Sequence, residues 1–212
     1  MFYELKTPSS MVKIQKSDIS IKSLIDVFGK EYLIQEIDNP ISLCKFDGED
    51  FSWDKNFKAI TAVSQPRVLY SNDKRISAMF KSDEGMVSVS YNIDEDGLGT
   101  SFMTDSEDEN GMCILLKLYS FSCNENGSDY RMITAANGMN GFTKVEDGIS
   151  VAELKSLSDS SVEISSAFNG NGAEISVTGT WDIYAKAGNE TLEIALVPKK
   201  KGEQLAFKLN MV

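Results

Sequence analysis

The chain has 212 residues, of which 42% are hydrophobic and 25% charged, a composition typical of a globular protein rather than of a disordered one. Its net charge is −11, and nine acidic residues without a single basic one lie between positions 82 and 116, a field that disfavours binding to nucleic acid or to anionic membranes. The chain contains no histidine, which excludes Ser-His-Asp and Cys-His catalysis and His-ligated metal sites of the usual kind.

The cellular compartment is predicted from the N-terminus and the cysteines. Residues 1–6 lack the basic segment and continuous apolar run of a signal peptide, and no apolar stretch approaches the roughly 20 residues of a membrane helix. The three cysteines, Cys44, Cys113 and Cys123, form no Cys-x-x-Cys pair, and an odd number does not suit a disulfide framework. We therefore expect a cytoplasmic protein with reduced, mostly buried thiols and no membrane association.

The N-terminal half combines one predicted helix with several predicted strands. Apolar residues at helical spacing, Ile21, Leu24, Ile25 and Phe28, predict a helix over residues 20–28 that ends at Gly29. Period-two patterns then predict strands over residues 32–37, 41–46, 57–63, 67–70, 76–80 and 86–93.

The C-terminal half continues with strands at residues 112–123 and 130–136. A capping box, Ser150 with Glu153 three residues later, predicts a short helix over 151–157. Alternating apolar residues after it predict a four-stranded antiparallel meander over 162–168, 174–186, 192–196 and 205–211, with a bulge or bend at Gly179.

These elements predict a mainly β fold of antiparallel sheets, sandwich or barrel-like, with one or two short helices and the C-terminal meander. We expect a single β-rich domain over residues 1–212, with a subdivision into 1–138 and 142–212 as the alternative, because the turn signals at 138–141 are too short to establish a linker.

A calcium site is the cofactor hypothesis that the sequence offers. Asn92, Asp94 and Asp96 place oxygen side chains at alternate positions before a glycine, as in the first half of a calcium-binding loop. However, Met103 stands where an EF-hand has its bidentate glutamate, and the preceding segment has a strand pattern. The alternative is a solvated hairpin loop without a cofactor.

Three surface segments are candidates for binding a protein partner. The acidic residues Asp105, Glu107, Asp108 and Glu109 can dock a basic surface, and the basic cluster Lys199, Lys200 and Lys201 can meet an acidic one, including that of a second copy. The alternative for both is an ordinary solvated turn. The aromatic residues Phe51, Trp53 and Phe57 form either a binding patch or a loop that folds back on the core.

The absence of any catalytic motif favours a non-enzyme. The sequence suggests a non-catalytic interaction or assembly module, such as a self-assembling structural component of virion type. One alternative is an acidic, charge-based inhibitor of a nucleic-acid-binding protein, and another is a calcium- or carbohydrate-binding β-sandwich. Under each hypothesis direct nucleic-acid binding is disfavoured, because no basic and aromatic strand pattern is present.

Overall fold

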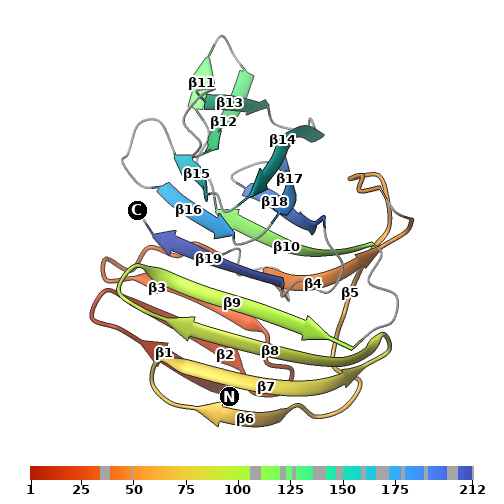
Figure 1. Cartoon of the computed structure of the whole chain (residues 1–212). Helices are drawn as coiled ribbons and strands as arrows, with labels where there is room; N and C mark the ends of the chain where they lie inside the picture. The colour runs from red at the N-terminus through yellow and green to blue at the C-terminus, as the bar shows by residue number, and fades with distance from the viewer. Residues whose placement is uncertain are drawn as a thin grey trace.

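The computed structural model describes residues 1–33, 39–48, 50–105, 111–119, 123–125, 128–135, 142–146, 150–158, 161–165, 172–177, 180–188, 191–199 and 205–211. Within these ranges every regular element is a β-strand (Figure 1). The strands are β1 Phe2–Lys6, β2 Ser10–Gln15, β3 Ile21–Asp26, β4 Ile41–Phe46, β5 Phe57–Ala59, β6 Arg67–Ser71, β7 Arg75–Ser82, β8 Gly85–Ile93, β9 Gly97–Thr104, β10 Met112–Tyr119, β11 Cys123–Glu125, β12 Ser128–Ala135, β13 Phe142–Glu146, β14 Ser150–Ser158, β15 Ser161–Ser165, β16 Gly172–Val177, β17 Thr180–Gly188, β18 Thr191–Pro198 and β19 Leu205–Met211. The described part of the chain holds no helix of the length and apolarity that crossing a membrane requires.

The strands form three antiparallel sheets. The ten-stranded sheet follows the order β11-β12-β15-β16-β19-β9-β8-β7-β6, with β13 paired to β12. A six-stranded sheet follows the order β14-β17-β18-β10-β4-β5, and β1-β2-β3 form a third sheet that lies behind β7–β9 (Figure 1). Isolated bridges from Ile25 to Glu31 and from Leu33 to Leu118 connect β3 with β10. The mainly β, antiparallel fold expected from the sequence is therefore confirmed.

The hydrophobic core lies between these sheets and explains why buried and exposed side chains alternate along the strands. In β7 and β8 every second side chain is buried, including Ile76, Val89 and Tyr91, while the residues between them face outward. Trp181 of β17, in the six-stranded sheet, is completely buried in the same core. Each fully buried aliphatic side chain contributes about 1.5–3 kcal/mol relative to exposure, so the alternation fixes which face of each strand points inward.

The helix predicted over residues 20–28 is wrong, because this segment is the strand β3. The pairing of β3 with β2 shifts by one residue at Lys22, which forms a bulge. A bulge inserts one extra residue, so Ile21 and Leu24 both face the core although they are three residues apart. That spacing imitates a helix, whereas Phe28, on the predicted apolar face, is 91% exposed.

The helix predicted over residues 151–157 is also wrong. This segment lies in β14, which pairs with β17 and shows two register shifts, between Val151 and Glu153 and between Leu154 and Leu157. Irregular pairing of this kind interrupts the period of two, which is the signal that sequence analysis uses to recognise a strand.

The predicted C-terminal meander is wrong in its connections, although its strands exist. The strand expected over 174–186 is divided between β16, in the ten-stranded sheet, and β17, in the six-stranded sheet. Accordingly β19 pairs with β16 and β9 rather than with β18. Gly179, the expected bend, lies outside the described residues. Both sheets bury one face, so the same alternation continues where the chain passes from one sheet to the other.

The proposed boundary near residues 138–141 also lies outside the described residues. Strands from the two sides of it share both large sheets, since β10 pairs with β18 and β9 pairs with β19. The single-domain organisation and its alternative remain predictions.

Candidate functional site

A groove of about 510 Å³ lies on the outer face of the ten-stranded sheet, across β7, β8, β9 and β19. Two rows of directly opposed residues cross these strands. The first row is Ser77, Ser90, Ser101 and Ala206, and the second is Arg75, Asn92, Gly99 and Lys208. The first row has small side chains throughout, which leaves the middle of the face hollow. The residues that line the groove are Arg75, Ser90, Asn92, Gly99, Thr100, Ser101, Ala206 and Phe207.

Gly99 shapes the second row by its lack of a side chain. A Cβ atom at this position would lie 2.5 Å from Oδ1 of Asn92, so the Asn92 side chain lies over the glycine. On the other side of Asn92, Nε of Arg75 donates a long hydrogen bond of 3.4 Å to Oγ of Ser90. The groove therefore presents an amide, a guanidinium group and two serine hydroxyls to solvent, a mixture of donors and acceptors.

An exposed aromatic side chain extends the first row at the edge of the sheet. Tyr70 of β6 is directly opposite Ser77 and is 50% exposed. Its hydroxyl accepts a hydrogen bond of 2.8 Å from Nδ2 of Asn72. The same face thus carries an apolar ring beside polar groups.

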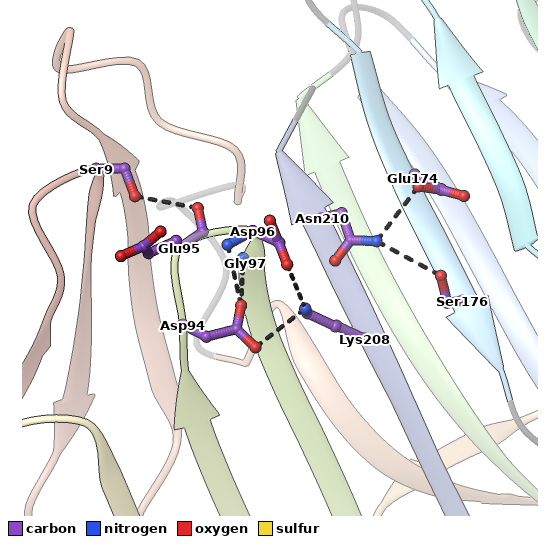
Figure 2. Close-up of polar contacts among 9 residues, drawn as sticks. All are labelled: Ser9, Asp94, Glu95, Asp96, Gly97, Glu174, Ser176, Lys208 and Asn210. Atoms are coloured by element: carbon purple, nitrogen blue, oxygen red, sulfur yellow. Dashed lines mark hydrogen bonds and ion pairs between the residues drawn. The ribbon is translucent and has the colours of Figure 1, made fainter.

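The second row continues into an ion-pair cluster centred on Lys208 (Figure 2). Nζ of Lys208 lies 3.0 Å from Oδ2 of Asp94 and 3.3 Å from Oδ2 of Asp96. Oδ1 of Asp94 accepts hydrogen bonds from the backbone N–H groups of Asp96 and Gly97, which fixes the turn between β8 and β9. Partial burial acts to lower the pKa of Lys208, but the two carboxylates hold it above its ordinary value. Partial burial likewise acts to raise the pKa of Asp94, but Lys208 and the backbone donors hold it low.

Three further hydrogen bonds hold this end of the face together (Figure 2). Nδ2 of Asn210 donates to Oε2 of Glu174 at 3.3 Å and to Oγ of Ser176 at 3.5 Å. Oγ of Ser9 donates to the backbone carbonyl of Glu95 at 3.1 Å, which connects the three-stranded sheet with the β8–β9 turn.

The predicted calcium ligands fall on this same cluster. Asp94 and Asp96 lie together, but Lys208 places an ammonium group between them, and Asn92 lies over Gly99 in the groove. Among the described residues, no group of three or more acidic, cysteine or histidine side chains is placed to hold a metal. Calcium needs about six to eight oxygen ligands, so a bound ion would have to displace Lys208. The calcium site stays a prediction.

The predicted aromatic patch lies on the outer face of the six-stranded sheet, away from the groove. The rings of Phe51 and Tyr184 stack with their centroids 4.4 Å apart, and Trp53 packs edge-on against Phe51 at 5.1 Å. Phe57 also contacts Phe51, and all of these rings pack against the buried residues Cys44, Phe46, Cys113, Leu115 and Ala195. This is the arrangement of a loop folded back on a sheet, and binding of a partner there stays a prediction.

The charged candidates are described in part. Asp105 accepts a hydrogen bond of 2.6 Å from the backbone N–H of Met86, and Lys199 pairs with Asp182 at 2.9 Å. The remaining candidates, Glu107, Asp108, Glu109, Lys200 and Lys201, lie outside the described residues. A role in partner binding stays a prediction for all of them.

Sequence reasoning missed the groove. It recognised residues 76–80 and 86–93 as strands but gave no weight to the outward-facing positions of β8, which are Ser88, Ser90 and Asn92. Small polar residues at three successive outward positions, with Arg75 beside them, were the available signal. The register that aligns them with Ser101 and Gly99 is not visible in the sequence.

The comparisons with known proteins identify the fold. No protein-family model matches the sequence, and no curated protein is detectably similar to it. Among solved structures, a galactose mutarotase-like protein from Lactobacillus casei is similar over 100% of both chains, with a TM-score of 0.67 and 12% identity.

Two further solved structures extend this likeness. A galactose mutarotase related enzyme from Lactobacillus acidophilus is similar over 100% of this chain and 97% of its own, with a TM-score of 0.64 and 12% identity. A 4-alpha-glucanotransferase from Thermococcus litoralis is similar over 37% of its own length, with a TM-score of 0.64 and 9% identity. At such identities the likeness establishes the fold alone.

These neighbours correct the function expected from the sequence. The expectation of an interaction or assembly module of virion type, or of a charge-based inhibitor, is wrong, because the structures that share the fold are galactose mutarotase-like. The sequence misled because a β-rich chain without a catalytic motif is common to many unrelated functions.

Proposed function

We propose that this protein binds a carbohydrate in the groove on the outer face of the ten-stranded sheet, and that it does so without converting the sugar. The observation that carries the proposal is the hollow row Ser77, Ser90, Ser101 and Ala206, flanked by Arg75 and Asn92. The names of the structural neighbours, galactose mutarotase-like proteins and a glucanotransferase, support a sugar as the ligand.

The chemistry of the groove suits a sugar ring. Each sugar hydroxyl both donates and accepts hydrogen bonds, as do the Asn92 amide and the serine hydroxyls, while the Arg75 guanidinium adds donors in a fixed planar fork. Tyr70 supplies an apolar ring on the same face, against which the C–H face of a sugar can pack. A volume of about 510 Å³ is within the usual range of small-molecule sites.

The proposal that the protein does not convert the bound sugar rests on the positions and partners of the carboxylates. Acid–base catalysis needs a group within reach of the substrate whose pKa lies near the working pH. Among the described residues that line the groove there is no carboxylate. On the same face Asp94 and Asp96 are bound to Lys208, and the pKa of Asp94 is held away from neutrality.

Isothermal titration calorimetry with galactose and with maltotriose tests the proposal. We expect at least one of these sugars to bind, and the variants Asn92→Leu and Arg75→Met to weaken binding about tenfold each, since each removes hydrogen bonds of about 1–1.5 kcal/mol. Asn56→Leu, the same change at an exposed position outside the groove, is the matched control and should leave binding unchanged.

Failure of both sugars to bind, or binding that Asn92→Leu and Arg75→Met leave intact, would contradict the groove as the site. Polarimetry of freshly dissolved galactose tests the second part. We expect the protein to leave the rate of mutarotation at the buffer value, and an acceleration that Arg75→Met removes would show that the groove is catalytic.

A further inference from the structure

A second cavity of about 280 Å³ lies inside the sandwich, between β4 and the inner face of β7–β9. Its floor is apolar and buried, with Ile41, Ile60 and Phe102 among its residues. Its mouth is formed by residues that are partly or fully exposed, Thr61 and Ala62 among them. The cavity is thus open to solvent at one end and belongs to the opposite face of the sheet from the groove.

The turn between β2 and β3 closes one side of this cavity with a strained residue. Ile19 has a φ of 57°, a left-handed conformation that β-branched residues rarely adopt, yet its side chain is 2% exposed. Its N–H donates to the carbonyl of Gln15 at 2.9 Å. Glycine or asparagine is usual in such a conformation. Backbone strain of this kind is concentrated at sites of ligand binding and at switch regions.

The strained turn fixes an acidic side chain at the cavity. The N–H and the hydroxyl of Ser20 both donate to Oδ1 of Asp18, at 3.0 and 2.7 Å. The second carboxylate oxygen has no partner in the described part of the chain. Among the described residues that line the cavity, Asp18 is the one charged group, so its negative charge has no basic neighbour there.

Two further polar residues, Asn39 and Tyr91, line the same space. Oδ1 of Asn39 is buried and has no hydrogen-bond partner, although unpaired buried polar atoms are rare in folded proteins. Tyr91 is 3% exposed, and burial together with the Asp18 carboxylate raises the pKa of its hydroxyl, which therefore remains neutral. Two of these three groups, Asp18 and the Asn39 oxygen, can only accept hydrogen bonds.

From this arrangement we infer that the cavity binds a small organic ammonium ion with an apolar body. The ammonium group donates to Asp18 and Asn39 at the polar side, and the body packs on Ile41, Ile60 and Phe102. A cation also gains from the aromatic side chains that line the cavity, Phe80, Tyr91 and Phe102. A cavity of roughly 150 Å³ accommodates benzene, so this one has room for an aromatic ring with a short arm. This site is independent of the proposed sugar groove.

Calorimetric titration of the whole protein at pH 7 tests the inference with three isosteric probes: phenethylammonium, 2-phenylethanol and phenylacetate. We expect phenethylammonium to bind about tenfold more tightly than the alcohol, because it makes a charge-assisted hydrogen bond, and phenylacetate to give no binding. Asp18→Asn should reduce the affinity for the ammonium to that for the alcohol, because it removes the negative charge. Asparagine keeps the oxygen that accepts the hydrogen bonds from Ser20, so the turn itself should be preserved.

Three further variants complete the test. Ala62→Phe, at the partly exposed mouth, should fill the cavity and abolish binding of both probes, whereas Asp54→Asn, the same change as Asp18→Asn at an exposed site, should leave binding intact. Asn92→Leu, in the sugar groove, should also have no effect. The inference is overturned if phenethylammonium does not bind, if Asp18→Asn leaves its affinity unchanged, or if Ala62→Phe still binds it. Circular dichroism spectra that match the wild type confirm that each variant is folded.

Discussion

Two glycines in one strand, Gly97 and Gly99 of β9, should differ strongly in their response to the same substitution, alanine. A Cβ atom on Gly97 would lie 2.0 Å from the backbone oxygen of Leu209 and 2.8 Å from Cα of Asn210, far inside the 3.4 Å at which ordinary contact begins. Since these atoms belong to the neighbouring strand β19, they can move only if the two strands separate. On Gly99 the nearest atom is Oδ1 of Asn92, the end of a flexible side chain, at 2.5 Å.

The expected change in the free energy of unfolding follows from the contacts that each substitution disturbs. Separating β9 from β19 at Gly97 removes the hydrogen bond from Met211 to the Asp96 carbonyl and disturbs the adjoining backbone pair and the Lys208 cluster, so Gly97→Ala should destabilise the protein by about 3 kcal/mol. Gly99→Ala removes a flexible glycine from a strand, which stabilises by about 0.5–1 kcal/mol. Turning the Asn92 side chain away costs about as much, so its net effect should lie within about 1 kcal/mol of zero.

Urea unfolding followed by tryptophan fluorescence measures both changes, with the buried Trp181 as a reporter of the core. The expected result is a large fall in the midpoint for Gly97→Ala and almost none for Gly99→Ala. Equal effects of the two substitutions would refute the reasoning, because they would mean that the β9–β19 contact is not as close as the structure places it. Since Gly99→Ala displaces Asn92, it should also weaken sugar binding without a matching loss of stability.

Three further predictions concern single groups. Burial raises the pKa of both Cys44 and Cys113, so in the folded protein iodoacetamide should label them roughly 100-fold more slowly than in urea, and rapid labelling seen by mass spectrometry would contradict this. Partial burial acts to raise the pKa of Asp94 but Lys208 holds it below its ordinary value, so the free energy of unfolding lost in Asp94→Asn should be constant above about pH 5, where the carboxyl is ionised in both the folded and the unfolded chain, and shrink as the pH falls further; a loss independent of pH between about 3 and 6 would speak against the ion pair. Ile19→Gly should be less destabilising than Ile19→Ala by about 1 kcal/mol, although glycine is the smaller residue, because alanine keeps the left-handed strain; chemical denaturation of the two variants decides the order.

The sequence by itself determined the class of the fold and several of its strands. Alternation of apolar residues in β7 and β8 places Ile76, Val89 and Tyr91 inward, and the structure buries all three. The pattern failed where a single inserted residue changed the period, as at Lys22, which made a strand resemble a helix. It also failed between β16 and β17, where the alternation gives no sign that the chain changes sheets.

The tertiary structure alone decided where polar groups meet. Arg75, Asn92 and Gly99 are brought into one row with Lys208, more than a hundred residues further along the chain, by the pairing of β9 with β19. The inner cavity likewise joins Asp18, Asn39 and Tyr91 from three separate segments. Hydrophobic alternation is a local property that each strand carries in its own residues, whereas the register between distant strands depends on packing of the whole sandwich. For that reason the sequence predicts which face of a strand is polar, but not which polar residues share a site.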